Sequence, residues 1–164
     1  VKERSVAMFR SLIESRQKVV DKYRDALPNL KADFAKGEAV FRRECQACHR
    51  VNNIGTEIGP SLATIRHRAP EEVLLHILDP NREVGPNFVA YAVETTDGRV
   101  LTGLIVEDTA SSITLIRTTG TRETILRPQI ADIAATGQSL MPPGLEDRVT
   151  PQEMADLLAF LLPK

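Results

Sequence analysis

The most constraining feature of this chain is the stretch Cys45-Gln46-Ala47-Cys48-His49, which contains both of its cysteines and one of its three histidines. A helical pattern leads into this stretch, and residues three apart on a helical turn lie on one face, about 5–6 Å apart. Two thiols and an imidazole are therefore expected together at the end of a helix. Whatever fold the chain adopts must accommodate the group that these side chains bind.

Three kinds of site use cysteines at this spacing. Covalent haem attachment uses all three reactive side chains of the motif, because the two cysteine sulfurs bond the porphyrin and the next residue, His49, binds the iron. A closed zinc site needs four ligands, and His67 and His76 do not have the spacing of a zinc finger. A redox dithiol is typical of a thioredoxin-like βαβ context, whereas this motif follows a helix and precedes a loop. We therefore predict one haem c held by Cys45, Cys48 and His49, with the other two sites as alternatives.

Haem iron usually takes a second axial ligand on its other face. Met154 falls on an apolar helical stripe, which favours a role in core packing. Met141 lies in the loop "SLMPPG", where Pro142 restricts it to extended backbone and stiffens the segment. We predict His49 and Met141 as the iron ligands, with an ordinary loop methionine as the alternative. The other side chains considered are Met8, His67 and His76.

Helices are predicted in the first half of the chain and at its end. Apolar residues recur at helical spacing over 2–27, and Pro28 ends that pattern. A second helix begins after Asp33, a good N-cap, and runs into the cysteine motif. The stretch "APEEVLLHILDP" predicts a short helix between two prolines. The last helix is expected to begin at a capping box formed by Thr150 and Glu153.

Residues 88–133 differ in character, because they are rich in Val, Ile and Thr and carry turn signals. Asp97-Gly98 and Thr119-Gly120 each separate two apolar runs, which predicts two β-hairpins. The stretch "QIADI" predicts one further short strand. Since aromatic residues make up only 4% of the chain, we expect a mostly aliphatic core.

The helical part resembles a class I cytochrome c. The resemblance rests on the pattern G-x3-F-x3-C-x2-C-H that begins at Gly37, on "IGPSL" after it, and on "MADLLAFL" near the end. It implies that the carbonyl of Pro60 accepts a hydrogen bond from Nδ1–H of His49. We expect Leu62 in the wall of the haem pocket.

The same resemblance implies a crossing of the second and last helices. Leu157 and Phe160 would pack across Gly37 and Phe41, and the glycine would permit the close approach of the two backbones. A glycine inside a helix costs about 1 kcal/mol relative to alanine, so such a crossing would explain its presence.

The interval between His49 and Met141 is too long for a small cytochrome. Removing residues 86–134 would leave an interval normal for compact bacterial members, so we interpret the β segment as an insertion that resembles a small Sm-like or SH3-like barrel. The expected fold class is thus α+β: a mainly α class I cytochrome c fold with an inserted small antiparallel β-barrel-like subdomain and an extra N-terminal helix. The expected parts are 1–28 (N-terminal helix or linker), 29–85 (proximal half), 86–134 (β insert) and 135–164 (distal loop and C-terminal helix).

The order of the motifs over about residues 30–162 also resembles a narrower family. This is the haem-binding cytochrome c domain found at the C-terminal end of large multidomain proteins of planctomycetes and their relatives. The resemblance implies one-electron transfer by a domain that is not itself an enzyme. Its expected partners are redox proteins, with a fused or separate dehydrogenase as donor and another electron carrier as acceptor. The alternatives are a haem-based gas or redox sensor with a labile sixth ligand, and an interaction module.

Charge and hydropathy add expectations about partners and location. The net charge of −1 gives no argument for a nucleic-acid partner. No run of about 18 apolar residues is present, so we expect no direct membrane span. Because the chain opens with Val1, we expect a piece or a processed product of a longer protein. The family attaches haem outside the bacterial cytoplasm, which implies a periplasmic or otherwise exported location.

Overall fold

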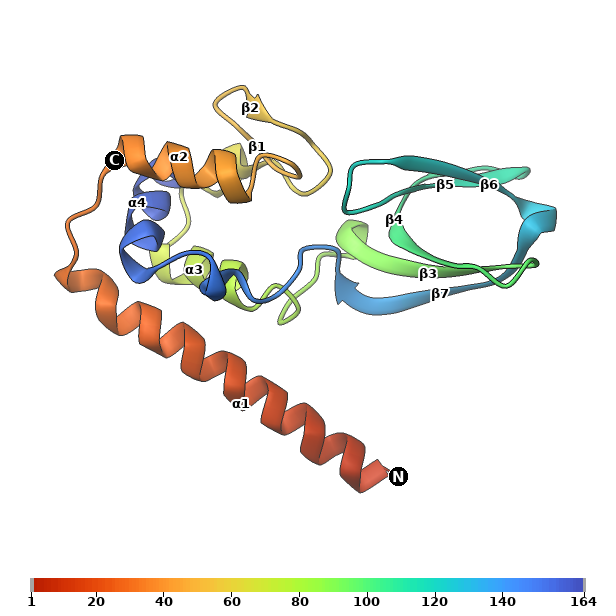
Figure 1. Cartoon of the computed structure of the whole chain (residues 1–164), viewed down its shortest axis with the longest axis horizontal. Helices are drawn as coiled ribbons and strands as arrows, with labels where there is room; N and C mark the ends of the chain where they lie inside the picture. The colour runs from red at the N-terminus through yellow and green to blue at the C-terminus, as the bar shows by residue number, and fades with distance from the viewer. Residues whose placement is uncertain (1, 164) are drawn as a thin grey trace. The chain divides into compact units, whose positions relative to one another are not determined.

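The computed structural model describes the backbone of residues 2–163 and the side chains of residues 14–163. The chain forms two compact units, whose elements are labelled in Figure 1. The helical unit contains four α-helices and includes Leu62–Pro80. The second unit contains the cysteine motif, within Cys45–Ser61, and a β-sheet, within Asn81–Pro142. The motif and the sheet therefore belong to one unit.

The helical unit confirms the predicted helices and their caps. Asp33 Oδ1 accepts hydrogen bonds from the backbone N–H groups of Ala35 (2.9 Å) and Lys36 (3.1 Å), which fixes the start of the second helix. Thr150 and Glu153 form the predicted capping box at the start of the last helix. The elements are α1 (Lys2–Ala26), η1 (Leu27–Asn29), α2 (Phe34–Glu44), η2 (Leu62–Ile65), α3 (Pro70–Leu78), η5 (Leu145–Asp147) and α4 (Pro151–Leu161).

Helices α2 and α4 cross at Gly37. A Cβ atom added there would lie 1.9 Å from the backbone oxygen of Asp156 and 2.8 Å from Cβ of Phe160. Next to this contact, the rings of Phe41 and Phe160 lie 5.5 Å apart. The glycine therefore lets the two backbones touch, as the sequence predicts, and the aromatic pair fills the space beside them.

Helix α1 is joined to the segment that precedes α4. The buried hydroxyl of Tyr23 donates a hydrogen bond to the backbone oxygen of Val149 at 2.5 Å. Burial raises the pKa of this phenol, and the nearby carboxylate of Glu146 raises it further. Arg16 forms an ion pair with Glu146. Specific polar contacts of Arg16 and Tyr23 thus hold this part of α1 within the helical unit.

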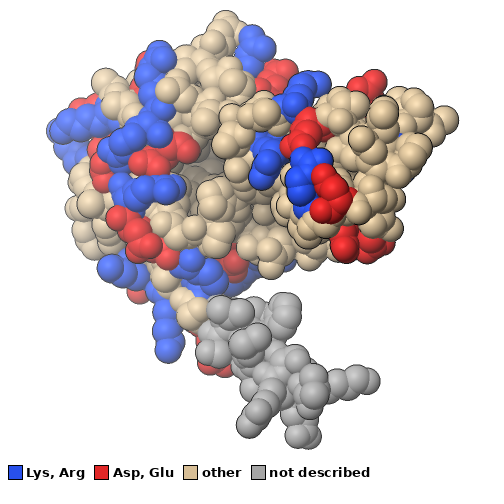
Figure 2. All heavy atoms as spheres, turned by 45° about the vertical axis from the view of Figure 1, so that its right-hand side comes forward, with Lys and Arg blue, Asp and Glu red and all other residues tan. Residues whose placement is uncertain are grey.

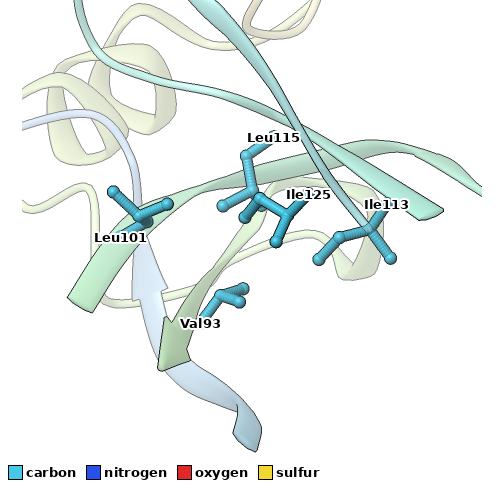
Figure 3. Packing of buried hydrophobic residues seen from close by; sticks show 5 residues of the cluster. All are labelled: Val93, Leu101, Ile113, Leu115 and Ile125. Carbon is cyan, nitrogen blue, oxygen red and sulfur yellow. The ribbon is translucent and has the colours of Figure 1, made fainter. Parts of the chain in front are cut away.

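The second unit is dominated by a five-stranded antiparallel sheet with strand order β6-β5-β4-β3-β7. Both predicted hairpins are present, and Gly98 (φ +84°) and Gly120 (φ +80°) supply the left-handed backbone that their turns require. An aliphatic cluster fills the concave side of the sheet, where Val93, Ile113 and Leu115 are fully buried (Figure 3). The strands are β3 (Val89–Thr95), β4 (Val100–Asp108), β5 (Ser112–Ile116), β6 (Arg122–Leu126) and β7 (Ile130–Ser139), with η3 (Pro86–Phe88) before β3 and η4 (Arg127–Gln129) between β6 and β7.

The sheet is not a closed barrel, which corrects the barrel-like subdomain expected from the sequence. Strands β6 and β7 are its two edges (Figure 1). Closure of the sheet into a barrel would require β6 and β7 to pair. Instead, the three-residue helix η4 leads directly from β6 to the opposite edge, where β7 pairs with β3. Irregularities in the β3–β7 and β4–β5 ladders account for the curvature of the sheet without closing it. Strand β7 also extends to Ser139, beyond the stretch "QIADI".

Among the helices that the structure describes, none combines the length and the apolar character needed to cross a membrane.

Candidate functional site

The cysteine motif follows α2 directly in the chain and forms one turn. Helix α2 ends at Glu44, and the backbone N–H groups of Cys48 (3.1 Å) and His49 (2.9 Å) both donate to the carbonyl oxygen of Cys45. The predicted single turn that carries both thiols and the imidazole is therefore present. Both cysteines are half-buried, and within the described part of the chain they are not joined in a disulfide. Burial raises the pKa of the Cys48 thiol, which opposes formation of the thiolate that a redox dithiol needs.

An ionic network fixes the end of α2 just before Cys45. The Glu44 side chain is only 9% exposed, and its carboxylate accepts from Nε of Arg43 (2.8 Å) and Nε of Arg148 (3.0 Å). Arg43 also contacts Glu153 at the start of α4, with 2.9 Å between the paired atoms. These contacts join α2 to the segment that begins α4, so the first cysteine follows a firmly held helix end.

A short hairpin follows the motif, where the sequence predicted only a loop. Strands β1 (Arg50–Val51) and β2 (Ile54–Gly55) pair, and the turn residues Asn52 (φ 50°) and Asn53 (φ 62°) both have left-handed backbone. Asparagine is one of the residues that tolerate this conformation, and two such residues form a type I′ turn. The pair Asn52-Asn53 between apolar Val51 and Ile54 was therefore a usable hairpin signal in the sequence.

The chain after this hairpin returns to the motif and caps its carbonyl groups. The backbone N–H groups of Ile58 (3.0 Å) and Gly59 (2.7 Å) donate to the carbonyl oxygen of Cys48. Thr56 does the same for the two residues between the cysteines: its N–H bonds Gln46 O at 3.0 Å, and its hydroxyl bonds Ala47 O at 2.6 Å. Carbonyls of the turn that lack intrahelical partners are thereby satisfied, and the loop is held against the motif.

The imidazole of His49 is held in one orientation by the returning loop. Its Nδ1 lies 2.9 Å from the carbonyl oxygen of Pro60. A carbonyl can only accept, so Nδ1 carries the hydrogen and donates it, which leaves the lone pair on Nε2 for a ligand bond. Burial lowers the pKa of His49 and favours this neutral form, although the Pro60 contact opposes the shift.

Two glycines make the close approach of this loop possible, and sequence reasoning did not single out either of them. A Cβ atom at Gly59 would lie 2.6 Å from Cε1 of His49, so the backbone there lies against the ring. A Cβ atom at Gly55 would lie 2.1 Å from the backbone oxygen of His49, and its φ of +91° also favours glycine. The one sequence signal was that Gly59 immediately precedes Pro60 in "IGPSL".

The remaining candidate residues lie in different places. Met141 is half-buried in the second unit, and its backbone N–H donates to Oγ of Ser139 at 3.1 Å. Leu62 is half-buried at the start of η2, in the helical unit. Met154 is fully buried in the core of the helical unit. His67 is exposed, His76 is half-buried on α3, and the side chain of Met8 lies outside the described residues.

The donor set around the motif fits a covalently attached haem. Two thiols lie on one turn without a disulfide between them, and Nδ1 of the neighbouring imidazole is bonded to Pro60 O, which leaves Nε2 as the ring nitrogen for a ligand bond. A family model for cytochrome c matches residues 34–119. The matched segment contains Cys45, Cys48 and His49 and ends before Met141. A search of curated proteins finds no match to this chain.

Proposed function

The chain belongs to the cytochrome c family, and we propose that it transfers single electrons through one haem whose iron is held by His49 and Met141. The cofactor itself follows from the family and the motif: haem c is bound covalently through Cys45 and Cys48. Haem c supplies a couple between ferric and ferrous iron. The domain is an electron carrier and is not itself catalytic.

The hydrogen bond between His49 Nδ1 and Pro60 O carries this proposal. It fixes the tautomer in which Nε2 is the available ligand atom, and it sets the plane of the ring. Gly59 lies against the same ring and leaves it little freedom to tilt. An iron ligand that is held before and after electron transfer changes little in geometry, which is what a carrier needs.

Three features support Met141 as the second ligand. Its backbone N–H is held by Ser139, its side chain is half-buried, and the two prolines that follow stiffen the segment. A thioether is a soft ligand that favours the ferrous state and raises the reduction potential. With both axial positions filled by protein, external ligands would have to displace a side chain before they could bind.

The absorption spectrum of the oxidised full chain tests this ligation. Iron bonded to a thioether gives a weak far-red band, so the wild-type protein should show it and Met141→Ala should lose it. Met154→Leu is the matched control, because it changes a buried methionine that is not proposed as a ligand while nearly conserving volume. A band unchanged in Met141→Ala would contradict the assignment. Prompt binding of carbon monoxide to the reduced wild type at neutral pH would instead favour a sensor.

We also propose the cellular context from the family. The partners would be redox proteins, with a dehydrogenase as electron donor and a second carrier as acceptor, in the periplasm or another exported location. Acidic and basic side chains lie intermixed on the face drawn in Figure 2, in keeping with a net charge of −1. The order of motifs from the first cysteine to α4 supports membership of the planctomycete-type C-terminal domains, with 86–134 as the β insert. Reduction of the purified chain by a candidate dehydrogenase and its substrate would test the donor.

A further inference from the structure

We propose that Asn81 and Ser139 are positioning residues that hold Met141 by tying its segment to the end of the β-sheet. This inference rests on the proposed ligation by Met141. It names the parts of the chain that would keep the methionine in place, and it assigns a role to the sheet that the family match does not supply.

Two hydrogen bonds form a short relay that ends at the methionine. The side-chain oxygen Oδ1 of Asn81 accepts from the backbone N–H of Ser139 at 2.8 Å. The hydroxyl oxygen of Ser139 then accepts from the backbone N–H of Met141 at 3.1 Å. Asn81 and Ser139 lie 58 positions apart in the sequence, so the relay joins the two ends of the segment that contains the sheet.

The chemistry of the segment makes the Met141 amide important. Pro142 and Pro143 have no backbone N–H, so over these three residues Met141 carries the sole amide hydrogen. Ser139 is the residue that accepts it. Because Pro142 also restricts Met141 to extended backbone, this one bond removes much of the freedom that the methionine backbone would otherwise have.

The end of strand β7 needs an anchor of this kind. The ladder with β3 is irregular here: Tyr91 pairs with Ala135, and the next pairing joins Val89 to Ser139. Between these pairings β7 carries more residues than β3, and one of them is Gly137, which has φ +71°. Asn81 bonds the strand at Ser139, just beyond this irregularity and two residues before the methionine.

A further contact stabilises the irregular part of β7 itself. The hydroxyl of Thr136 donates to the backbone oxygen of Ala90 at 2.7 Å and accepts from the N–H of Gln138 at 3.1 Å. The irregular part of β7 is thus held from both sides, by Thr136 before Gly137 and by Asn81 after it. The end of β7 is therefore held in place just before the segment that contains Met141.

The expected effect can be stated as a change in an equilibrium. Asn81 is exposed and Ser139 is half-buried, so each bond is worth an amount that corresponds to about two- to tenfold in an equilibrium constant. If the bonds hold Met141 at the iron, their loss makes the methionine easier to displace. The apparent affinity of an external ligand for the ferric protein then rises by the same factor.

Imidazole titration of the full-length oxidised haem protein is the test, with the far-red band as a second readout. Asn81→Ala and Ser139→Ala should each bind imidazole about two- to tenfold more tightly than wild type and should weaken the band. Asn81→Asp and Ser139→Thr keep the accepting oxygen, so they should restore affinities close to wild type. The matched control is Thr109→Val. Thr109 Oγ1 likewise accepts backbone N–H groups, those of Ser111 and Ser112, just after strand β4 of the same sheet, so the variant removes bonds of the same kind away from Met141.

The outcomes separate this inference from the ligation on which it rests. Wild-type imidazole affinity in both alanine variants, together with loss of the band in Met141→Ala, would overturn the positioning role alone. An equal rise in affinity in Thr109→Val would also overturn it, because the effect would then be general loosening of the sheet. A far-red band retained in Met141→Ala would overturn the ligation itself. Increased affinity in the two alanine variants, with rescue and an unaffected control, is the result that we expect.

Discussion

Replacing Gly59 by alanine would place a methyl group against the His49 imidazole. The added Cβ would lie 2.6 Å from Cε1, 3.0 Å from Nδ1 and 3.1 Å from Nε2, whereas ordinary contact begins near 3.4 Å. All three near atoms belong to one ring, so the imidazole cannot avoid the methyl by a small rotation. The ring must move away, and Nδ1 then loses its present geometry with Pro60 O.

The size of the effect follows from packing and from the role of the Pro60 contact. Forcing an extra methyl group into a filled site costs about 1–3 kcal/mol. Changes to the partner that orients a metal-ligating histidine typically cost about 10–100-fold in metal affinity, which is a similar free energy. The φ of Gly59 lies outside the left-handed region, so alanine adds no backbone strain and the effect is purely one of contact.

Urea titration of the oxidised haem protein, followed by its absorption spectrum, measures this effect. We expect the transition in which His49 leaves the iron to shift to lower urea in Gly59→Ala, by an amount that corresponds to about 1–3 kcal/mol. Gly85→Ala is the matched control, because a Cβ there meets its nearest atom at 3.6 Å and the residue has φ −58°. A Gly59→Ala transition that coincides with that of wild type would refute the proposed packing of the loop on the ring.

Three further predictions concern the helical unit. Gly37→Ala should lower the free energy of unfolding by about 1–3 kcal/mol, although alanine is the better helix former by about 1 kcal/mol, because Cβ would meet the backbone of α4; an increase in stability would contradict the crossing. Tyr23→Phe should cost about 1–3 kcal/mol in denaturant unfolding, since it leaves the Val149 carbonyl unpaired in a buried place, and a neutral effect would contradict this. The hydrogen bond from the Thr150 N–H, assisted by Arg43, lowers the pKa of Glu153 in the folded protein. The charged Glu153 carboxylate therefore stabilises the fold above its unfolded-state pKa of about 4.3, and this contribution is lost as the pH falls through its folded-state pKa. Glu153→Gln keeps the capping box, so it should be less stable than wild type at neutral pH and equally stable in acid. A difference in stability that grew in acid would contradict the lowered pKa of Glu153.

Elements with local signals could be predicted from the sequence. Asp33 and the Thr150-Glu153 capping box marked the starts of α2 and α4, because a cap acts within one turn of the helix that it begins. Gly98 and Gly120 marked both hairpins of the large sheet, because their turns need left-handed backbone. The crossing at Gly37 was expected from the resemblance to class I cytochromes c, and a close helix contact is a sufficient reason for a glycine at that position.

Features that depend on distant residues were not predictable in the same way. The contact between Asn81 and Ser139 joins positions at opposite ends of a segment, and neither residue carries a signal of it. The strand order, which leaves β6 and β7 at opposite edges, also depends on long-range pairing and turned a predicted barrel into an open sheet. The packing of Gly59 on His49 lies between these cases, because the residues are close in sequence but the contact depends on the whole returning loop.

The attachment of haem to this chain is tested most directly by its mass. The full chain would be matured in a host that attaches haem, denatured and extracted with acid–acetone before mass spectrometry. We expect the pigment to stay with the protein and the mass to be that of the polypeptide plus one haem. Colour that passes into the acetone, with a mass equal to that of the bare polypeptide, would contradict attachment through Cys45 and Cys48.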